Sequence, residues 1–212
     1  VSCSQKEWDE EWNPYFDLDT NYRKIRKSIP ADDVFLKNCA RSGAGIRILR
    51  QDNFEMLISF IISQRKSIPA IRTSVERLVG LYGKDGFFPE PKAMLAATED
   101  ELAPCGLGYR CSYVYNAAKR VALGEFDLDK MDLLPDEELL DKLKSFAGVG
   151  DKVANCVALF AYHRYGRAPV DTWIAKIINE QYGGSNPFPR YGSVAGIMQQ
   201  YMFYYDLLRN SR

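Results

Sequence analysis

Apolar residues recur at intervals of three and four along almost the whole chain after residue 17, which is the period of helices packed by one face. Glycine and proline clusters separate these runs, as at Gly83, Gly106 and Gly148. Strands are expected at most as short pieces near the start and around Ile46 to Leu49. The pattern therefore predicts an all-α fold. The expected helices cover residues 19–29, 32–42, 54–65, 67–83, 91–104, 110–124, 135–146, 150–164, 171–182 and 192–209.

Length and charge exclude some classes of protein but leave the partner open. With 212 residues, 46% hydrophobic and 26% charged, the chain is neither disordered nor fibrous and can bury a core without a disulfide or a metal. Lys plus Arg equal Asp plus Glu at 28 each, so the overall positive charge of many nucleic-acid binders is missing. A local cationic face would still suffice to grip a short stretch of DNA. The segment FEMLISFII (54–62) is apolar nearly all round, which predicts a buried central helix.

The five cysteines are odd in number and irregularly spaced, which fits neither a zinc site nor a disulfide framework. We expect thiols in a reducing compartment. No apolar run reaches the roughly 18 residues of a membrane span, and the start lacks a secretory signal. These features predict an intracellular protein that does not enter a membrane. The chain begins with Val1, and residues 1–18 read as a remnant or linker from an upstream domain.

The most informative segment is LKSFAGVGDKVANCVALFAYH (143–163), which predicts a helix, a tight turn and a second helix. Gly148, Val149 and Gly150 form the turn, where the two glycines permit positive φ and let the backbone approach a partner closely. The amides of such a turn and the positive end of the next helix form a seat for phosphate. A plain helix connector with a glycine cap is the alternative.

Lys152 lies at the start of the second helix, and Cys156 follows one turn later on the same side. The adjoining face, with Val153 and Val157, is apolar. A nucleophilic amine must lose its proton, and partial desolvation beside apolar residues at a helix N-terminus makes that loss easier. Lys152 is therefore a candidate nucleophile, although a solvated surface lysine is the alternative.

A carboxylate occupies a comparable position further along, where the apolar stretch Ala168-Pro169-Val170 ends in Asp171 directly before the helix TWIAKIINEQ. Asp171 is a suitable N-cap for that helix. Capping and chemistry are compatible, because a carboxylate held by backbone amides stays ionised and can stabilise cationic charge on a sugar.

The strings AGVGDKVANC (147–156) and APVDTWI (168–174) resemble the helix-hairpin-helix signature of base-excision DNA glycosylases, and the likeness runs from about Tyr15 to the C-terminus. Gly148, Gly150, Lys152 and Asp171 match in order and spacing. Ala147 departs from the pattern, since many relatives carry proline there, and we expect a less stiff turn.

Three further strings resemble the 8-oxoguanine DNA glycosylase branch: YFDLD (15–19), RILRQDNFEMLISFIISQ (47–64) and LGYRCSYV (107–114). Endonuclease III relatives hold an iron-sulfur cluster on four cysteines after the carboxylate, whereas this chain has no cysteine beyond Cys156. Monofunctional relatives generally lack a lysine at the position of Lys152. The resemblance therefore implies a bifunctional DNA glycosylase with AP lyase activity.

The resemblance also assigns the contacts to an extruded base. Gln199 and Phe203 lie one turn apart, off the expected core stripe of the last helix. That stripe comprises Val194, Ile197, Met198, Tyr201, Tyr205 and Leu208. By resemblance, Phe203 stacks on one face of the base, Cys156 covers the other and Gln199 bonds the Watson–Crick edge. Packing of Phe203 on a neighbouring lobe is the alternative.

Other residues are implied to contact the DNA around the gap. Tyr109 would insert into the gap and Arg110 would contact the orphaned partner base. The alternative there is a glycine-capped turn with a packed tyrosine and a solvated arginine. Arg65 and Lys66 stand where the branch carries asparagines, and Ala70 replaces an arginine that reads the opposite cytosine. We therefore expect looser discrimination of the opposite base.

The implied architecture is a two-lobed helical HhH-GPD glycosylase core that lacks an N-terminal mixed α/β domain. Residues 19–50 with 165–212 would form the first lobe, and residues 51–164 the second, which ends in the helix-hairpin-helix. No cofactor is expected, although the hairpin turn could hold a structural monovalent cation. The expected partner is duplex DNA with a damaged base, bound by a monomer in the cytoplasm or nucleoid of a prokaryote or the nucleus of a eukaryote.

Two other functions stay open at this point. A non-catalytic helix-hairpin-helix module would use the turn and Lys152 only to grip phosphates. A monofunctional glycosylase would use Asp171 to activate water and would not need the lysine.

Overall fold

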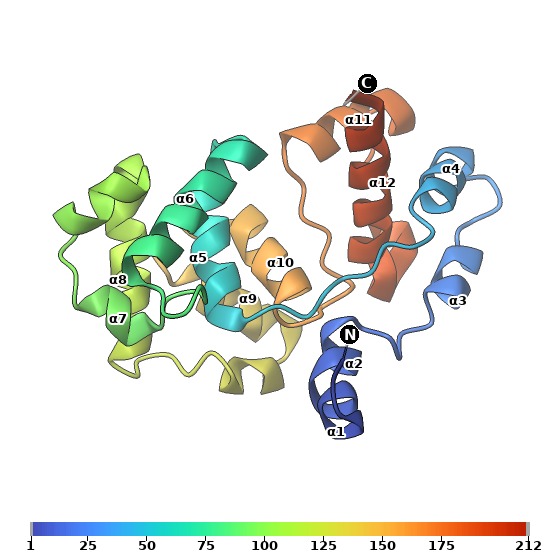
Figure 1. Ribbon diagram of the computed structural model, residues 1–212. Coiled ribbons are helices and arrows are strands. Elements are labelled where there is room, and N and C mark those ends of the chain that lie inside the picture. Colours follow the sequence, from blue (N-terminus) through green and yellow to red (C-terminus); the bar gives the residue numbers. More distant parts are fainter. Residues whose placement is uncertain (1, 211–212) are drawn as a thin grey trace. The chain divides into compact units, whose positions relative to one another are not determined.

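A computed structural model describes residues 2–210 of the chain, and every regular element within that range is helical (Figure 1). The predicted all-α fold is confirmed. The suggested strand around Ile46 to Leu49 is wrong, because that segment runs without a strand partner beside helices. Ile48 is buried there, and its amide donates to the Tyr22 hydroxyl rather than to a neighbouring strand.

Ten α-helices of five or more residues carry the described chain, and shorter turns connect them. These helices are α3 (Tyr22–Lys27), α4 (Val34–Ser42), α5 (Asn53–Ser63), α6 (Ile68–Tyr82), α7 (Pro91–Leu95), α8 (Cys111–Ala122), α9 (Asp136–Lys144), α10 (Asp151–Phe160), α11 (Thr172–Tyr182) and α12 (Ala195–Asn210). The shorter elements are α1 (Gln5–Glu7), the π-helical η1 (Trp8–Trp12), α2 (Asn13–Tyr15) and the 3₁₀ turns η2 (Asp100–Cys105), η3 (Gly108–Arg110), η4 (Lys130–Leu133) and η5 (Phe188–Val194). Among the described residues, no helix has both the length and the apolar character needed to cross a membrane.

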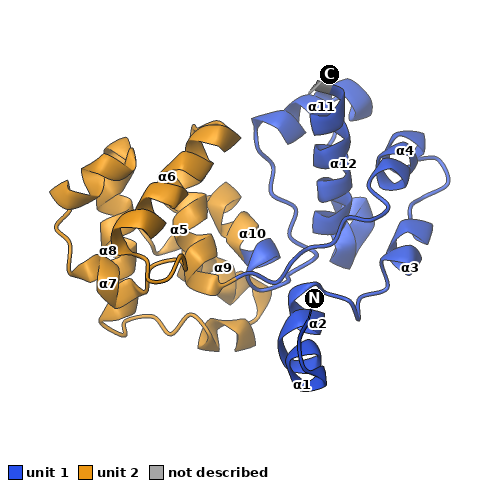
Figure 2. Cartoon of the chain, in the orientation of Figure 1, with its two compact units in different colours: residues 1–51, 158–212 blue, residues 52–157 orange. Residues whose placement is uncertain are grey.

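The chain divides into two compact units (Figure 2). Unit 1 comprises residues 1–51 and 158–212, and unit 2 comprises residues 52–157. Helix α10 begins in unit 2 and ends in unit 1, so one continuous helix carries Lys152 in the second unit and Leu159 in the first.

Unit 2 is built around α5, which packs against α6 and α8. Leu57, Ile58 and Ile61 of this helix have no exposed surface, so the prediction of a buried helix at 54–62 is confirmed. Asp52 caps its first turn by accepting a hydrogen bond from the Glu55 amide at 2.8 Å. This cap starts the helix directly after the connection from unit 1.

Unit 1 is built around α12, which packs against α4 and α11. Tyr201 and Met202 are fully buried in its core, whereas Leu208 is 42% exposed. The last position of the predicted core stripe is therefore wrong, because the end of α12 runs past the core. Gly196 at the other end of α12 allows a close approach, since a Cβ there would lie 2.8 Å from Leu159 Cδ1 and would also collide with the Arg167 carbonyl.

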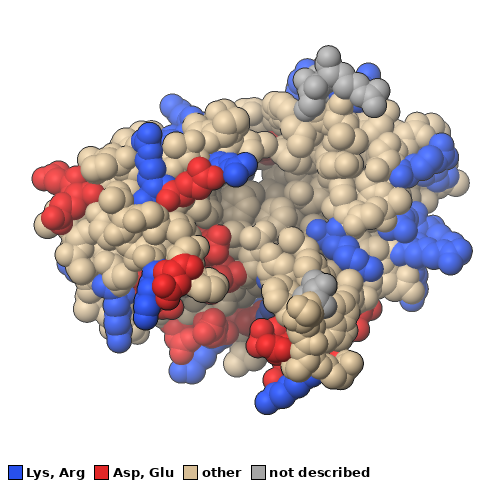
Figure 3. Space-filling model, in the orientation of Figure 1, with Lys and Arg blue, Asp and Glu red and all other residues tan. Residues whose placement is uncertain are grey.

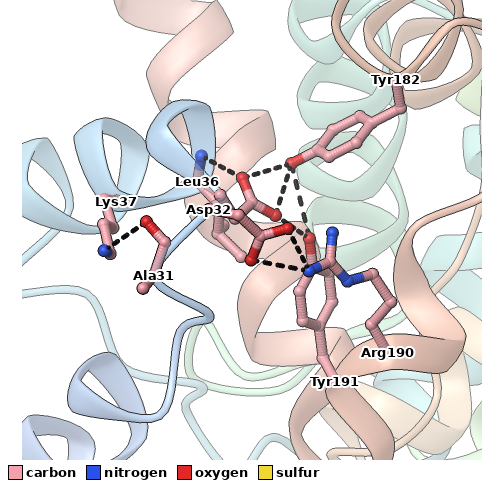
Figure 4. A network of polar contacts seen from close by, with 8 residues as sticks. Ala31, Asp32, Leu36, Lys37, Tyr182, Arg190 and Tyr191 are labelled. Carbon is pink, nitrogen blue, oxygen red and sulfur yellow. Dashed lines mark hydrogen bonds and ion pairs between the residues drawn. The ribbon is translucent and has the colours of Figure 1, made fainter.

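A buried carboxylate joins α4 to two other elements of unit 1 (Figure 4). Asp33 caps α4 by accepting from the Leu36 amide at 2.9 Å. It also accepts hydrogen bonds from the hydroxyls of Tyr182 in α11, at 3.1 Å, and of Tyr191 in η5. Burial raises the pKa of both tyrosines, so their hydroxyls remain donors to the carboxylate. The neighbouring Asp32 forms an exposed ion pair with Arg190 at 2.8 Å.

Two local differences from the predicted helices involve reciprocal hydrogen bonds between side chains and backbone amides. Residues 5–15 are helical, and the Ser4 hydroxyl and Glu7 carboxylate start this segment with a reciprocal capping box. The predicted helix at 91–104 is interrupted between α7 and η2, and Thr98 and Glu101 exchange reciprocal hydrogen bonds at this break. The Ser4 and Glu7 capping box thus marks the start of the segment at 5–15.

Candidate active site

The predicted hairpin lies between α9 and α10, and its tight turn depends on one of its two glycines. Gly148 has φ +81°, and a Cβ there would lie 2.8 Å from Cγ of Tyr113. Gly150 is exposed, has no positive φ, and has open space where a Cβ would be. Both glycines permit a positive φ, and Gly148 is the one of the two that adopts it. Between them, Val149 buries its side chain and closes the turn with a hydrogen bond from its amide to the Phe146 carbonyl at 3.0 Å.

Lys152 is half-buried in the first turn of α10. Its Nζ lies 5.7 Å from the centroid of the Phe60 ring of α5, an arrangement in which the ring attracts a cation but gives no hydrogen bond. The amine thus lies beside an apolar side chain, as its position in the sequence predicts. Cys156 follows one turn later, and its side chain is 96% buried, with 4% exposed.

Asp171 caps α11, as the sequence predicts. One carboxylate oxygen, Oδ1, accepts a hydrogen bond from the Ile174 amide at 2.8 Å, and the residue is half-buried. A carboxylate in this position faces the positive end of the helix, an electrostatically favourable arrangement. The carboxylate is thus held in place by a backbone amide and not by another side chain.

Gln199 and Phe203 lie on α12 with different environments. Gln199 is 3% exposed, and its Oε1 accepts a hydrogen bond from the Gln200 side chain at 2.6 Å. Phe203 packs at the edge of the unit 1 core, with its ring centroid 5.7 Å from that of Trp173. Trp173 was not singled out from the sequence, although it lies two residues after Asp171 and is 36% exposed.

In the turn that carries Tyr109 and Arg110, the tyrosine is exposed and the arginine is buried, which is the opposite of what a plain capped turn predicts. Tyr109 is 57% exposed, whereas Arg110 is only 6% exposed. The Arg110 guanidinium donates to the Leu107 carbonyl at 3.0 Å and to the Gln64 carbonyl, and it lies 4.3 Å from the Tyr109 ring centroid. The alternative of a packed tyrosine and a solvated arginine is therefore wrong in both parts.

The two cations of the loop between α5 and α6 also differ from each other. Arg65 is exposed and has a positive φ of 51°. The Lys66 ammonium donates to the Ser74 hydroxyl and to the Gly106 carbonyl, at 2.6 Å each. Partial burial and the nearby guanidinium groups lower the pKa of Lys66. Ala70 is exposed on α6.

The predicted site residues are divided between the two units. Unit 2 contains the hairpin glycines, Lys152, Cys156, Tyr109, Arg110 and the two loop cations, whereas unit 1 contains Asp171, Gln199 and Phe203. A pocket of about 400 Å³ in unit 1 contains none of them. That pocket is lined by Leu18, Asp19, Thr20, Asn21, Tyr22, Arg23, Arg26, Ala44, Gly45, Ile46 and Arg47.

Charge is unevenly distributed on the surface despite the net charge of zero. On the face shown in Figure 3, Lys and Arg side chains gather over α3 and α4, whereas both signs are interspersed over unit 2. Helix α3 alone contributes Arg23, Lys24, Arg26 and Lys27. A cationic face is therefore compatible with equal numbers of acidic and basic residues.

The residues present offer no ready site for a transition metal. Within residues 2–210, no three His, Cys, Asp or Glu side chains come together as a possible metal site.

Comparison with known families accounts for most of the chain. Residues 1–57 match the family model of the 8-oxoguanine DNA glycosylase N-terminal domain. Residues 58–199 match that of the HhH-GPD superfamily of base excision DNA repair proteins, a range that includes the hairpin, Lys152 and Asp171.

Individual relatives give the same result. A probable N-glycosylase/DNA lyase of Methanothermobacter thermautotrophicus is 28% identical over 96% of this chain and 76% of its own length. The N-glycosylase/DNA lyase of Saccharomyces cerevisiae is 32% identical over 79% of this chain, which spans half of the yeast protein.

A solved structure resembles the whole described fold. The Clostridium acetobutylicum 8-oxoguanine glycosylase/lyase, in complex with double-stranded DNA containing cytosine opposite 8-oxoguanine, superposes with a TM-score of 0.91 and 35% identity. The match covers 98% of this chain and 77% of that one. The chain therefore belongs to the HhH-GPD superfamily of base excision DNA repair proteins.

Proposed function

We propose that this protein is a bifunctional DNA glycosylase and AP lyase that removes 8-oxoguanine from duplex DNA. The observation that carries the proposal is the placement of Lys152, a half-buried amine beside the Phe60 ring directly after the hairpin turn. The family match extends over this position, and the relative from Clostridium acetobutylicum that covers nearly the whole chain is an 8-oxoguanine glycosylase/lyase.

The proposed reaction takes place at the sugar of the damaged nucleotide. Uncharged Lys152 attacks C1′, and the bond from C1′ to the base breaks with its electron pair leaving on the base, which then takes up a proton. The ionised Asp171 stabilises the cationic charge that develops on the sugar. The lysine nitrogen loses one proton, and the C1′–O4′ bond breaks as O4′ takes up a proton, which gives a protonated Schiff base. Removal of a proton from C2′ then drives β-elimination, in which the bond between C3′ and its phosphate oxygen breaks and the phosphate leaves with the electron pair.

Other residues hold the DNA in the arrangement that this reaction needs. In the proposal, Phe203 and Cys156 cover the two faces of the extruded base and Gln199 bonds its Watson–Crick edge. The Gln199 side chain is buried, and this burial gives its amide a fixed orientation. Tyr109 is exposed enough to enter the gap in the duplex, with Arg110 against its ring.

The remaining contacts in the proposal involve the phosphates. The backbone of Gly148, Val149 and Gly150 seats a phosphate, which the open surroundings of Gly150 permit. Arg65 is exposed and can reach another phosphate. No cofactor takes part, and a monovalent cation at the hairpin carbonyls would be structural. We further propose that the protein acts as a monomer on chromosomal DNA inside the cell.

Borohydride trapping tests the proposal. A duplex with 8-oxoguanine opposite cytosine should give a covalent adduct with the protein, and Lys152→Gln should abolish it. Lys144→Gln is the matched control, because it removes a lysine from the end of α9, where the ammonium pairs with Asp141 at 3.0 Å, and it should leave the adduct intact.

The other outcomes identify the alternatives. Tight binding without an adduct would identify a DNA-binding module. Base release that survives Lys152→Gln would identify a monofunctional enzyme that depends on Asp171. Excision assays on duplexes with 8-oxoguanine opposite each of the four bases would test whether Ala70 loosens the choice of opposite base.

A further inference from the structure

Three cationic side chains hold the backbone around the turn that carries Tyr109. Each of them donates to main-chain carbonyls rather than to carboxylates. The contacts are Lys66 Nζ to the Gly106 carbonyl at 2.6 Å, Arg77 Nη1 to the Pro104 carbonyl at 3.3 Å, Arg110 Nη1 to the Leu107 carbonyl at 3.0 Å and Arg110 Nη2 to the Gln64 carbonyl.

This arrangement is electrostatically unfavourable on its own. In the described part of the chain, no ion pair joins any of these three cations to a carboxylate. Partial burial, together with repulsion from Arg110 and Arg77, lowers the pKa of Lys66. A neutral side chain at position 66 would avoid these electrostatic costs. What the charged side chain gains in return is two charge-assisted hydrogen bonds, which hold their acceptors more firmly than neutral ones.

The Lys66 ammonium joins three separate segments of unit 2. The residue lies in the loop after α5, and its ammonium bonds Ser74 on α6 and Gly106 in the turn after η2. Gly106 has φ +71° and leads directly into the buried Leu107 and the exposed Tyr109. The ammonium therefore fixes the start of a short segment whose end presents the tyrosine ring.

The Tyr109 ring has few other constraints. Its ring contacts are the Arg110 guanidinium at 4.3 Å and the edge of Tyr113 at 6.0 Å, and more than half of the side chain is exposed. Its direction therefore depends mainly on the backbone of the turn. Among the three cations described above, Lys66 ties this backbone to both α6 and the loop after α5.

We propose that Lys66 is a positioning residue for Tyr109: it holds the Gly106 turn so that the ring enters the duplex, instead of binding a phosphate itself. This inference rests on the proposed function, because it assigns Tyr109 the role of filling the gap left by the extruded base. It separates Lys66 from its neighbour Arg65, whose exposed side chain is suited to a phosphate.

The first test needs no DNA and no activity. Hydrogen–deuterium exchange of the segment 106–112 should become faster in Lys66→Met than in the parent protein, while Arg65→Met should leave it unchanged. Lys66→Gln, which keeps an uncharged N–H donor group, should give an intermediate rate and replaces the methionine variant if that variant does not fold. Unchanged exchange in both Lys66 variants would overturn the inference.

The second test measures how Lys66 acts on the reaction. Under single-turnover conditions at saturating enzyme, Lys66→Met should slow base excision by roughly tenfold, the scale of a lost charge-assisted hydrogen bond. The affinity for the duplex should change little. Arg65→Met should instead weaken binding and reduce its salt dependence, since it removes a phosphate contact.

A double-mutant cycle with Tyr109→Ala completes the test. If Lys66 acts through Tyr109, then Lys66→Met should slow excision no further once the ring has been removed. Additive effects, or a Lys66→Met variant that changes only affinity and salt dependence, would mean that Lys66 is a phosphate contact and would overturn the inference. Absence of excision in the parent protein, with faster exchange in Lys66→Met, would instead reject the proposed function.

Discussion

The ring of Tyr113 occupies the space in which any residue other than glycine at position 148 would place its Cβ. That atom would lie 2.8 Å from Tyr113 Cγ and 2.9 Å from Cε2. The same ring meets Tyr109 edge-on at 6.0 Å. One aromatic side chain of α8 therefore contacts both the hairpin turn and the tyrosine proposed to enter the duplex.

Gly148→Ala should destabilise the hairpin for two separate reasons. Alanine at φ +81° costs about 1–2 kcal/mol, and the collision with Tyr113 adds roughly 1–3 kcal/mol. The melting temperature should fall and binding to duplex DNA should weaken. Gly150→Ala is the matched control for the melting temperature alone, because its Cβ would meet nothing within 4 Å in the folded chain, whereas Gly150 belongs to the proposed phosphate seat.

The two costs can be separated with Tyr113→Ala. In the Tyr113→Ala background, Gly148→Ala no longer causes a collision. Its remaining loss of stability should be the cost of the positive φ alone. Equal melting temperatures for the Gly148→Ala and Gly150→Ala proteins would contradict the assignment of the tight turn to Gly148 alone.

Asp171 combines a structural contact with a proposed chemical one, and two substitutions distinguish them. Asn is as good an N-cap as Asp, whereas Ala loses the bond to the Ile174 amide and about 1 kcal/mol of stability. Asp171→Asn should therefore keep the melting temperature but slow base release strongly, because it removes the charge. Normal single-turnover rates for Asp171→Asn would mean that the residue serves only as a cap.

The helices could be predicted where a local pattern determines them. Six of the nine residues in the apolar run at 54–62 are buried, and Asp171 caps α11 as its place before TWIAKIINEQ indicates. The segment at 5–15 carried a signal that was missed, because Ser4 and Glu7 form the spacing of a capping box. Such short helices are determined by their caps rather than by apolar periodicity.

The environments of the site residues could not be predicted in the same way. Lys66 bonds a carbonyl 40 positions away, and Arg110 bonds one 46 positions away. These contacts depend on how α6, α8 and the intervening turns pack, and no pattern within a few residues encodes that packing. The roles given to Lys152, Asp171 and the base-binding residues remain predictions.

Asp33 should be far more important for stability than its neighbour Asp32. Asp33→Ala removes an N-cap and takes the carboxylate acceptor from the hydroxyls of the half-buried Tyr182 and the buried Tyr191, which should cost about 3 kcal/mol. Asp32→Ala loses an exposed ion pair with Arg190, worth at most about 1 kcal/mol. Denaturant unfolding of the two variants should show this contrast, and equal losses would contradict it.

Glu55 should make stability depend on pH in the opposite direction to most carboxylates. Burial, with a smaller contribution from Asp52, raises the pKa of Glu55 above its usual 4.5. The folded chain therefore holds this proton more tightly than the unfolded chain, and the stability gained at low pH is lost as the pH rises through the folded pKa. Glu55→Gln should melt higher than the parent protein near neutral pH, and the difference should shrink on acidification.

Glu101 provides a control of opposite sign for this titration. Hydrogen bonds from Thr98 lower the pKa of Glu101, so its contribution to stability is present at neutral pH and is lost as the pH falls through the folded pKa. Glu101→Gln should therefore melt lower than the parent protein near neutral pH, where Glu55→Gln melts higher. Thermal melts of both variants across the acidic range would test the pair. If Glu55→Gln, like Glu101→Gln, melts lower than the parent protein at neutral pH, then the desolvation of Glu55 does not outweigh its favourable position in the first turn of α5.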